Sequence, residues 1–419
     1  MSTATGRGNG AFRHRDFRFF WTGSLLESLA LNMVAVAIGW QVYAITGDPL
    51  DLGLIGLAEF LPLPLLALPA GHLADRFSRR ALFAFALTLN AAVSLGLLAL
   101  SASGPSTVWP YFALAFGNGI AAAIGAPAAR SMLPSLIPPA TLPSAMALGS
   151  TGWQAAIVAG PALGGLLLAV DAELTYAAAG ALSIAAVGCV AFVRERYRDS
   201  WTPEPVSIAS LLAGVQLIRR TPVLLGAISL DLFGVLLGGA VALTPVFAAD
   251  ILHVGEIGLG LLRGAPAAGA IVAGMILARR PVARRAGSTL LVVVAGFGAS
   301  MIVFGLSRAM WLSLLALAGA GAFDMVSVVL RATILPLVTP DGLRGRVNAV
   351  EMVFISGSNE LGAFESGVAA ALLGAVPAVV IGGIATIAVA FAWTRLFPAL
   401  ARVDRLEELR PAEAPGGVL

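Results

Sequence analysis

Lysine is absent from this chain of 419 residues, so its 26 residues of the lysine and arginine class are all arginines. A phosphate-binding P-loop needs a lysine, and so does Schiff-base catalysis, so the sequence excludes both chemistries. Cysteine is almost absent: Cys189 has no second cysteine with which to form an internal disulfide. The three histidines, His14, His72 and His253, do not have the spacing of metal ligands. We therefore expect no cofactor, no metal site and no enzymatic activity.

Charged residues are scarce as well. They make up 12% of the chain, hydrophobic residues make up 58%, and the mean hydropathy is +0.90. About a quarter of the residues in a soluble domain are charged, so this composition is typical of a polytopic membrane protein. The apolar stretch after Arg18 contains Glu27 and lacks a small-residue cleavage site, which predicts a first membrane span rather than a signal peptide.

Twelve apolar segments are long enough to cross a bilayer core of ~30 Å. They fall at roughly 17–45, 52–73, 81–101, 108–129, 142–170, 174–193, 222–250, 256–278, 288–307, 309–330, 346–373 and 375–397. The connections are short except for 194–221, a predicted cytoplasmic linker. The sequence thus predicts an all-α membrane protein with two six-helix bundles, 1–193 and 222–398, and a cytoplasmic tail at 399–419.

The arginines favour one side of the membrane. If both termini are cytoplasmic, all arginines except Arg308 and Arg263 fall in cytoplasmic segments, whereas the outer loops hold acids such as Asp48 and Asp171. This bias predicts the topology through the positive-inside rule. The pI of about 9.6 then reflects orientation in the membrane and not nucleic-acid binding.

The two halves repeat one another. A shift of 204 residues aligns rare intramembrane residues, and a shift of 201 aligns two further arginines. The aligned pairs are Glu27 with Asp231, Glu59 with Arg263, Pro62 with Pro266 and, at the second shift, Arg130 with Arg331. Transporters built from parallel six-helix repeats bind substrate between the repeats near the midplane.

Several charged residues lie within the predicted spans. An ionised side chain facing lipid costs at least ~2.5–3.5 kcal/mol at the bilayer centre, so these residues are expected to face one another or a wet cavity. The candidates for a proton or substrate cavity are Glu27, Glu59, Asp231, Arg263, Asp324, Glu360 and Glu365. Glu351 lies one turn from Arg346 and is interpreted instead as its partner at the start of a helix.

The roles of these charges leave alternatives open. Glu27 and Asp231 have no arginine nearby in sequence and are the best candidates for proton coupling, facing one another across the two halves. Asp324 precedes Arg331 by seven residues, too far for a direct pair, so it has either a structural or a gating role.

Arg263 needs a carboxylate partner or an anionic substrate. It could pair with Glu59 between the halves. If a simple two-fold axis separates that pair, Asp231, Glu360 or Glu365 is the nearer choice.

A short charged loop joins the second and third predicted spans. It contains Gly71, Asp75, Arg76, Arg79 and Arg80. The pattern Gly-x-x-x-Asp-Arg-x-x-Arg-Arg resembles the signature of major facilitator superfamily transporters. The resemblance implies a cytoplasmic gate in which Asp75 is a latch that pairs with an arginine.

The expected partner of Asp75 is Arg130, with Arg346 the next choice, and Arg331 belongs to the same predicted gate. The segment 142–170 contains Gly160-Pro161-Ala162-Leu163-Gly164-Gly165, which resembles the Gly-Pro-x-x-Gly-Gly motif of exporters in this superfamily. One residue departs from the proton-coupled drug antiporters: Ala115 stands where they usually have an arginine.

The C-terminal half is similar to the branch that contains the bacterial enterobactin exporter, on the segments 324–331, 339–347 and 358–367. The resemblance implies a monomeric secondary transporter of a bacterial inner or plasma membrane. It would export a small organic molecule, a siderophore or drug-like compound, by proton antiport, with the lipid bilayer around it and no nucleic-acid partner. An importer or lysophospholipid-type carrier on the same fold is the alternative, and a non-transporting sensor or enzyme a remote one.

Overall fold

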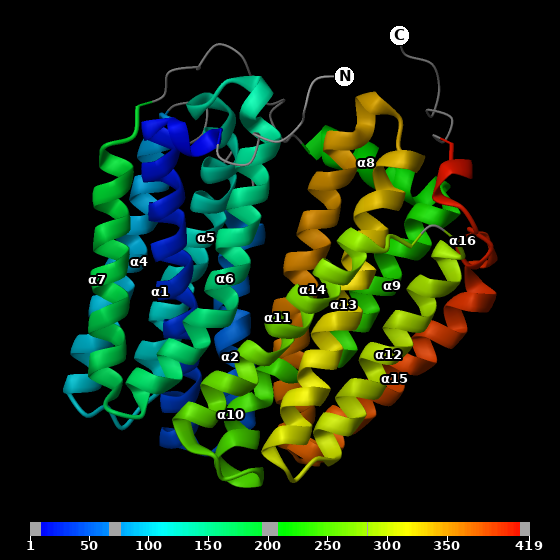
Figure 1. Cartoon of the computed structure of the whole chain (residues 1–419). Helices are drawn as coiled ribbons and strands as arrows, with labels where there is room; N and C mark the ends of the chain where they lie inside the picture. The colour runs from blue at the N-terminus through cyan, green and yellow to red at the C-terminus, as the bar shows by residue number, and fades with distance from the viewer. Residues whose placement is uncertain (1–9, 67–76, 195–207, 283, 411–419) are drawn as a thin grey trace. The chain divides into compact units, whose positions relative to one another are not determined.

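The computed structural model describes residues 10–66, 77–194, 208–282 and 284–410. All regular secondary structure in these ranges is helical (Figure 1). The longer helices are α1 (Arg15–Thr46), α2 (Pro49–Phe60), α4 (Arg79–Ala102), α5 (Trp109–Leu136), α6 (Leu142–Leu168), α7 (Ala172–Ala191), α8 (Ile208–Arg220), α9 (Pro222–Gly238), α11 (Gly255–Arg279), α12 (Ala286–Leu306), α13 (Met310–Val338), α14 (Arg344–Leu373) and α15 (Ala375–Leu396). The short helices α10 (Thr244–Val246) and α16 (Pro398–Ala401) follow α9 and α15.

Eleven helices in the described part of the chain are long and apolar enough to cross a membrane. The predicted span 346–373 is also helical, because α14 has 30 residues, but its arginines and acids make it too polar for that criterion. The prediction of an all-α membrane protein with about twelve spans is confirmed.

The predicted span 222–250 is not one continuous α-helix. Its first part, α9, ends at Gly238. A 3-10 turn at Ala240–Leu243 and the short helix α10 follow, and the span finishes as a π-helix at Phe247–Ile251. Pro245 has no backbone N–H to donate, which favours a break here. At the same place α14 approaches closely, since a Cβ on Gly239 would lie 2.9 Å from the Gly362 carbonyl carbon.

The predicted linker 194–221 is partly structured, because α8 occupies its second half. Leu217 and Ile218 on α8 are buried in a hydrophobic cluster. A Cβ on Gly214 would lie 2.8 Å from the Arg346 carbonyl oxygen, so α8 packs directly on α14. The two prolines of the linker indicated a loop, but the apolar residues after them form a helix that packs against the protein.

The chain forms two compact units by packing. The first comprises 1–47, 58–205 and 255–264, and the second comprises 48–57, 206–254 and 265–419. Each unit therefore includes the first part of one helix, α11 or α2, from the other half of the sequence. The halves 1–193 and 222–398 remain a prediction, because they were defined by the long connection 194–221 and not by packing.

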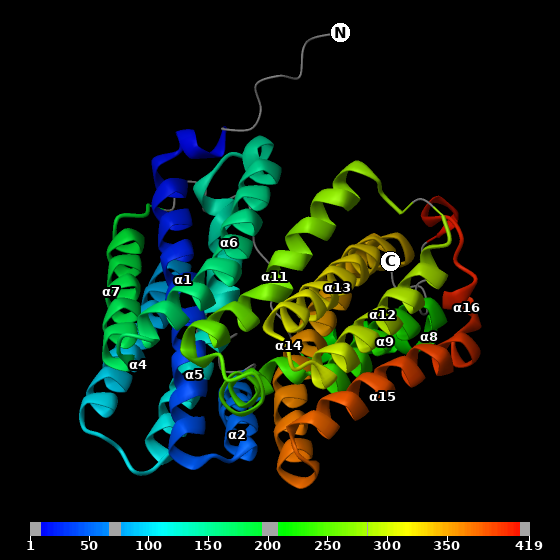
Figure 2. The same ribbon diagram turned by 60° about the horizontal axis from the view of Figure 1, so that its bottom comes forward.

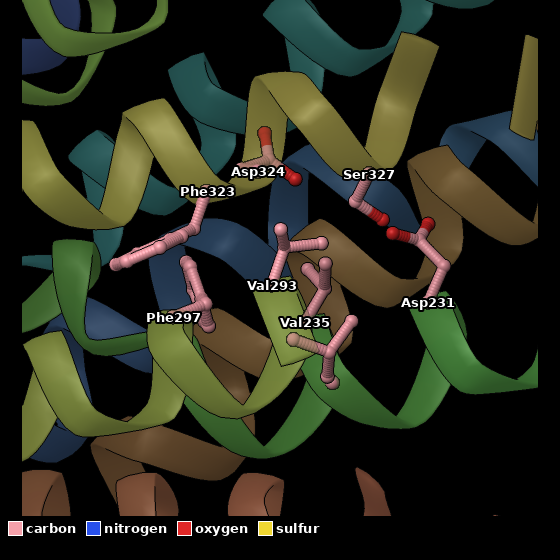
Figure 3. Close-up of a pocket in the computed structure, with 9 residues that line it drawn as sticks. Asp231, Val235, Val293, Phe297, Phe323, Asp324 and Ser327 are labelled. Carbon is pink, nitrogen blue, oxygen red and sulfur yellow. The ribbon is translucent and has the colours of Figure 1, made fainter. Parts of the chain in front are cut away.

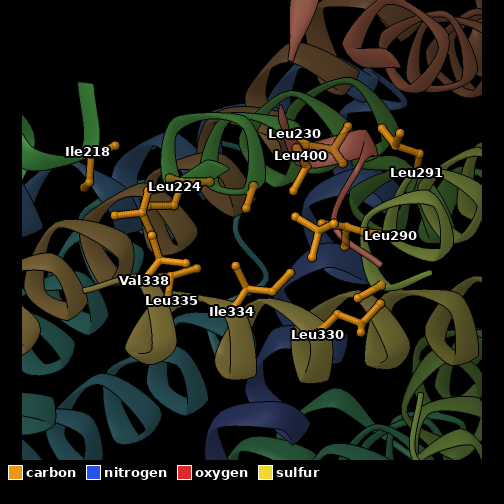
Figure 4. Close-up of a cluster of buried hydrophobic side chains, with 14 of the residues drawn as sticks. Ile218, Leu224, Leu230, Leu290, Leu291, Leu330, Ile334, Leu335, Val338 and Leu400 are labelled. Atoms are coloured by element: carbon orange, nitrogen blue, oxygen red, sulfur yellow. The ribbon is translucent and has the colours of Figure 1, made fainter. Parts of the chain in front are cut away.

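Each unit has its own core. In the first, α1 packs on α6 and α7, and Phe20 of α1 contacts Phe83 of α4 at 5.8 Å between ring centroids. In the second, α12 and α15 run side by side in both views (Figures 1 and 2). Leucine and isoleucine side chains from α9, α12 and α13 fill the space between these helices (Figure 4). This dry cluster is where the second unit positions its buried charges.

Candidate transport site

A buried arginine organises the second unit. Arg331 on α13 has only 4% of its side chain exposed, and its Nη2 lies 2.7 Å from Oδ1 of Asp231 on α9. Its Nη1 lies 3.8 Å from Oε1 of Glu351 on α14. Three helices, α9, α13 and α14, are therefore connected through one guanidinium.

Apolar residues adjoin this ion pair in sequence. Leu330 and Ile334 on α13 and Leu230 on α9 are buried in a hydrophobic cluster (Figure 4). Leu330 directly precedes Arg331, and Leu230 directly precedes Asp231. Because desolvating an isolated charge is costly, the buried guanidinium needs a paired carboxylate, which Asp231 supplies.

A small cavity adjoins the ion pair (Figure 3). It leaves about 20 Å³ for the centre of a water-sized molecule, which is room for about one water. Its lining combines polar and aromatic side chains, namely Asp231, Gly234, Val235, Val293, Val294, Phe297, Phe323, Asp324 and Ser327. Ser327 is 3% exposed, and its hydroxyl has no hydrogen-bond partner among the described residues.

Two predictions concern this region. Arg331 was grouped with the arginines of a cytoplasmic gate; its guanidinium is buried within the second unit, and a role in a gate remains a prediction. Glu351 was interpreted as the partner of Arg346, one turn away, and the structure places Arg331 of a neighbouring helix 3.8 Å from its carboxylate. Spacing along α14 alone did not reveal this neighbour.

Glu27, the repeat counterpart of Asp231, has different neighbours. It is 6% exposed on α1, and Nδ2 of Asn90 on α4 donates a hydrogen bond to its Oε1 at 2.5 Å. The hydroxyl of Ser183 on α7 also lies beside this carboxyl group. Glu27 Oε2 and Asn90 Oδ1 are both buried without a hydrogen-bond partner among the described residues.

The two pseudo-equivalent acids therefore differ, since Glu27 contacts an amide and Asp231 an arginine. Sequence neighbours did not reveal either partner. The prediction that these acids face one another concerns the placement of the two units and remains a prediction.

Arg263 and Glu59 belong to the same unit. Nη1 of Arg263 donates a hydrogen bond to the carbonyl oxygen of Ala35 at 2.7 Å. Glu59, which is half-buried, interacts electrostatically with Arg263 and hydrogen-bonds with the side chain of Asn118. Of the partners left open for Arg263, Glu59 is the one that the structure places near it, because the first ten residues of α11 pack with the first unit, where Glu59 lies.

The other α14 acids lie apart from the Arg331 cluster. A Cβ built on Gly56 of α2 would lie 3.3 Å from Oε2 of Glu360. Glu365 is half-buried and hydrogen-bonds with Ser366. Both glutamates lie at least nine residues beyond Glu351 on the same helix, about 13 Å at 1.5 Å per residue.

Only part of the predicted gate is described. Gly71, Asp75 and Arg76 lie outside the described residues. Nη1 of Arg79 donates to the Ser131 carbonyl at 3.0 Å, and Nη2 of Arg80 donates to the Ala191 carbonyl. The Ala191 carbonyl is at the last residue of α7, where positive charge is favourable, and the Ser131 carbonyl lies five residues before the end of α5.

Arg130 is exposed and Arg346 is half-buried. The latch between Asp75 and one of these arginines remains a prediction.

The exporter-type segment of α6 is a close-packing surface. Gly160, Pro161, Gly164 and Gly165 are all buried. A Cβ on Gly160 would lie 2.5 Å from the Asn32 Cβ of α1. One on Gly165 would lie 2.5 Å from the Glu256 carbonyl oxygen at the start of α11. Any larger residue would push α6 away from these helices.

Comparison with known proteins shows which family this chain belongs to. Residues 8–413 match the MFS-type family described as "Transmembrane secretion effector". The chain belongs to this family of the major facilitator superfamily. Enterobactin exporter EntS of Citrobacter koseri is 27% identical over 348 residues, which is 80% of this chain and 81% of that protein. The EntS of Shigella boydii serotype 18 is 26% identical over 347 residues, with the same coverage.

Solved structures agree on the fold. A bacterial homologue of the human lysosomal transporter Spinster, in an inward-facing and unoccupied conformation, has a TM-score of 0.73 at 14% identity, covering 92% of this chain and 97% of that one. A D-xylose-proton symporter has a TM-score of 0.71 at 14% identity, covering 93% and 99%. These structures show the fold, and the match to the family over residues 8–413 shows that the chain is a membrane transporter.

Three polar residues of this transporter escaped the sequence analysis: Asn90, Asn118 and Ser327. Each contacts or adjoins a buried acid. Their signal was the presence of an amide or hydroxyl within an apolar span. Because a single serine or asparagine in a span is common, only the helix packing shows which of them matter.

Proposed function

We propose that this transporter exports a small organic molecule, a siderophore or drug-like compound, across the bacterial cytoplasmic membrane in exchange for protons. The observation that carries the proposal is the similarity to the enterobactin exporters over 80% of the chain. The buried glycine-proline segment of α6 supports the outward direction, because it resembles the exporter motif. Both termini lie in the cytoplasm, as the arginine distribution favours.

Glu27 is the acid best arranged to bind the coupling proton. Its Oε1 already accepts a hydrogen bond from Asn90 Nδ2, while its Oε2 and Asn90 Oδ1 have no partner. Two facing acceptors are unfavourable, but a proton on Oε2 would let it donate to Oδ1 and complete a cyclic acid–amide pair. Protonation would thus satisfy two buried atoms and remove a buried charge.

The electrostatic surroundings agree with this assignment. No charged residue lies within one turn of Asn90 on α4 or of Ser183 on α7. Asp231 is different, because Arg331 at 2.7 Å stabilises its ionised form. We assign proton binding to Glu27 and a charge-pairing role to Asp231.

The substrate and direction can be tested in cells. A strain without its own siderophore and drug exporters would produce this transporter or the Glu27→Gln variant at matched membrane levels. Export predicts that compounds of one class, measured by mass spectrometry, fall in the cell pellet and rise in the medium. Accumulation in the pellet would indicate import instead, and an unchanged distribution for siderophores, dyes and antibiotics would contradict the proposal.

A further inference from the structure

We propose that the cavity of the second unit binds one monovalent cation, Na⁺ or hydronium, between Asp231, Asp324 and Ser327. Charge balance is the first argument. The cluster has three carboxylates, those of Asp231, Asp324 and Glu351, and only one guanidinium, that of Arg331. With all groups ionised the cluster has two uncompensated negative charges in an apolar surrounding, which burial strongly opposes.

The ion pairs leave Asp324 as the acid that needs compensation. Asp231 lies 2.7 Å from Arg331, and Glu351 lies 3.8 Å from it. Asp324 interacts with Arg331 only as a nearby charge, without an ion pair within 4 Å among the described residues. The guanidinium is thus shared, and one monovalent cation next to Asp324 would halve the net negative charge of the cluster.

The cavity is placed to receive that charge. Asp324, Ser327 and Arg331 follow at i, i+3 and i+7 on α13, which puts them on one face of the helix. Figure 3 shows Asp324 and Ser327 on α13 above the cavity, with the Asp231 carboxylate near the Ser327 hydroxyl. That hydroxyl is buried and has no hydrogen-bond partner among the described residues, so it is an available ligand.

The size and chemistry of the cavity select the ligand. About 20 Å³ holds one water-sized species and excludes an organic substrate. The polar atoms that line it are carboxylate and hydroxyl oxygens, which are the donors that hard cations prefer. Phe297, Phe323 and Val293 line the remaining sides.

The neighbouring helices carry few other charged side chains. Asp231 is the only charged residue of α9, and α12 has none. The remaining charges of α14 are Arg344 and Arg346, at least five residues before Glu351, and Glu360 and Glu365, at least nine residues beyond it. None of these four residues lines the cavity.

The test measures thermal unfolding of the purified full-length transporter, with no substrate present. Melting curves in NaCl are compared with curves in choline chloride at equal ionic strength, each at pH 8 and pH 6. A Na⁺ site predicts that NaCl raises the Tm by about 2 °C or more over choline chloride. A hydronium site predicts no sodium effect, but a Tm rise on acidification that depends on Asp324.

The variants decide the assignment. Asp324→Asn should abolish the cation response, Ser327→Ala should reduce it, and Glu365→Gln, an acid of α14 outside the cluster, should keep it. An equal response in the wild type and in both cluster variants would overturn the proposal, and so would the absence of any response. If Asp324→Asn fails to fold, Ser327→Ala alone decides, because removing one hydroxyl leaves every charge in place. The readout requires no export, so its failure is distinct from a failure of the proposed function.

Discussion

Breaking the ion pair of Asp231 and Arg331 should destabilise the second unit strongly. In Asp231→Asn the guanidinium stays buried, at 4% exposure, without its partner at 2.7 Å. Removing one member of a buried pair typically costs ~3–5 kcal/mol. Because Glu351 remains at 3.8 Å, we expect a loss near the lower end, about 3 kcal/mol.

A double-mutant cycle measures the coupling. The Asp231→Asn, Arg331→Gln and double variants are unfolded in mixed micelles, and Arg395→Gln, an exposed arginine on α15, serves as the control. The double variant should lose less stability than the sum of the single variants, by about 1–3 kcal/mol. The control should stay within about 0.5 kcal/mol of the wild type. Additive effects, or an Asp231→Asn loss as small as that of the control, would refute the reasoning.

Three further predictions follow from local geometry. Gly165→Ala should destabilise the transporter by about 1–3 kcal/mol in thermal unfolding, because the added Cβ would lie 2.5 Å from the Glu256 carbonyl oxygen. The control Gly149→Ala on the same helix should be neutral or stabilising, because its Cβ meets nothing within 4 Å. Glu27→Gln should keep stability and substrate binding but lose the pH dependence of efflux, since an amide beside Asn90 replaces the neutral acid and binds no proton. Efflux that still depends on pH in this variant would show that Glu27 does not bind the coupling proton. Arg263→Ala should lower the Tm by leaving Glu59 without its charged neighbour, and Glu59→Gln in that background should recover part of the loss; no recovery would argue against the pair.

Hydropathy predicted most of the fold because spans are long and apolar. Even the polar helix α14 was placed correctly, since its charges are widely spaced in a helix of 30 residues. The break after Gly238 was missed, because glycine and proline are common within spans, and the sequence does not show the close approach of Gly362 to Gly239. The helix α8 in the second half of the linker was also missed, because the prolines before it indicated a loop.

The acids of the site were found from their rarity in the membrane, but their partners were not. Arg331 pairs with Asp231, one hundred residues before it in sequence, because α9 and α13 pack together. The sequence left several acids open as the partner of Arg263, because it does not show that the start of α11 packs with the unit that contains Glu59. A repeat alignment identifies equivalent positions, but side-chain pairing depends on which helices lie next to one another.

Substrate-driven proton movement is the most direct test of proton-coupled export. The transporter is reconstituted in proteoliposomes that contain a pH-sensitive dye, and a siderophore or drug-like compound is added on one side. The account predicts that an accepted compound moves protons in the opposite direction, and that Glu27→Gln binds the compound without moving protons. Transport of the compound with no proton movement in the wild type would contradict it.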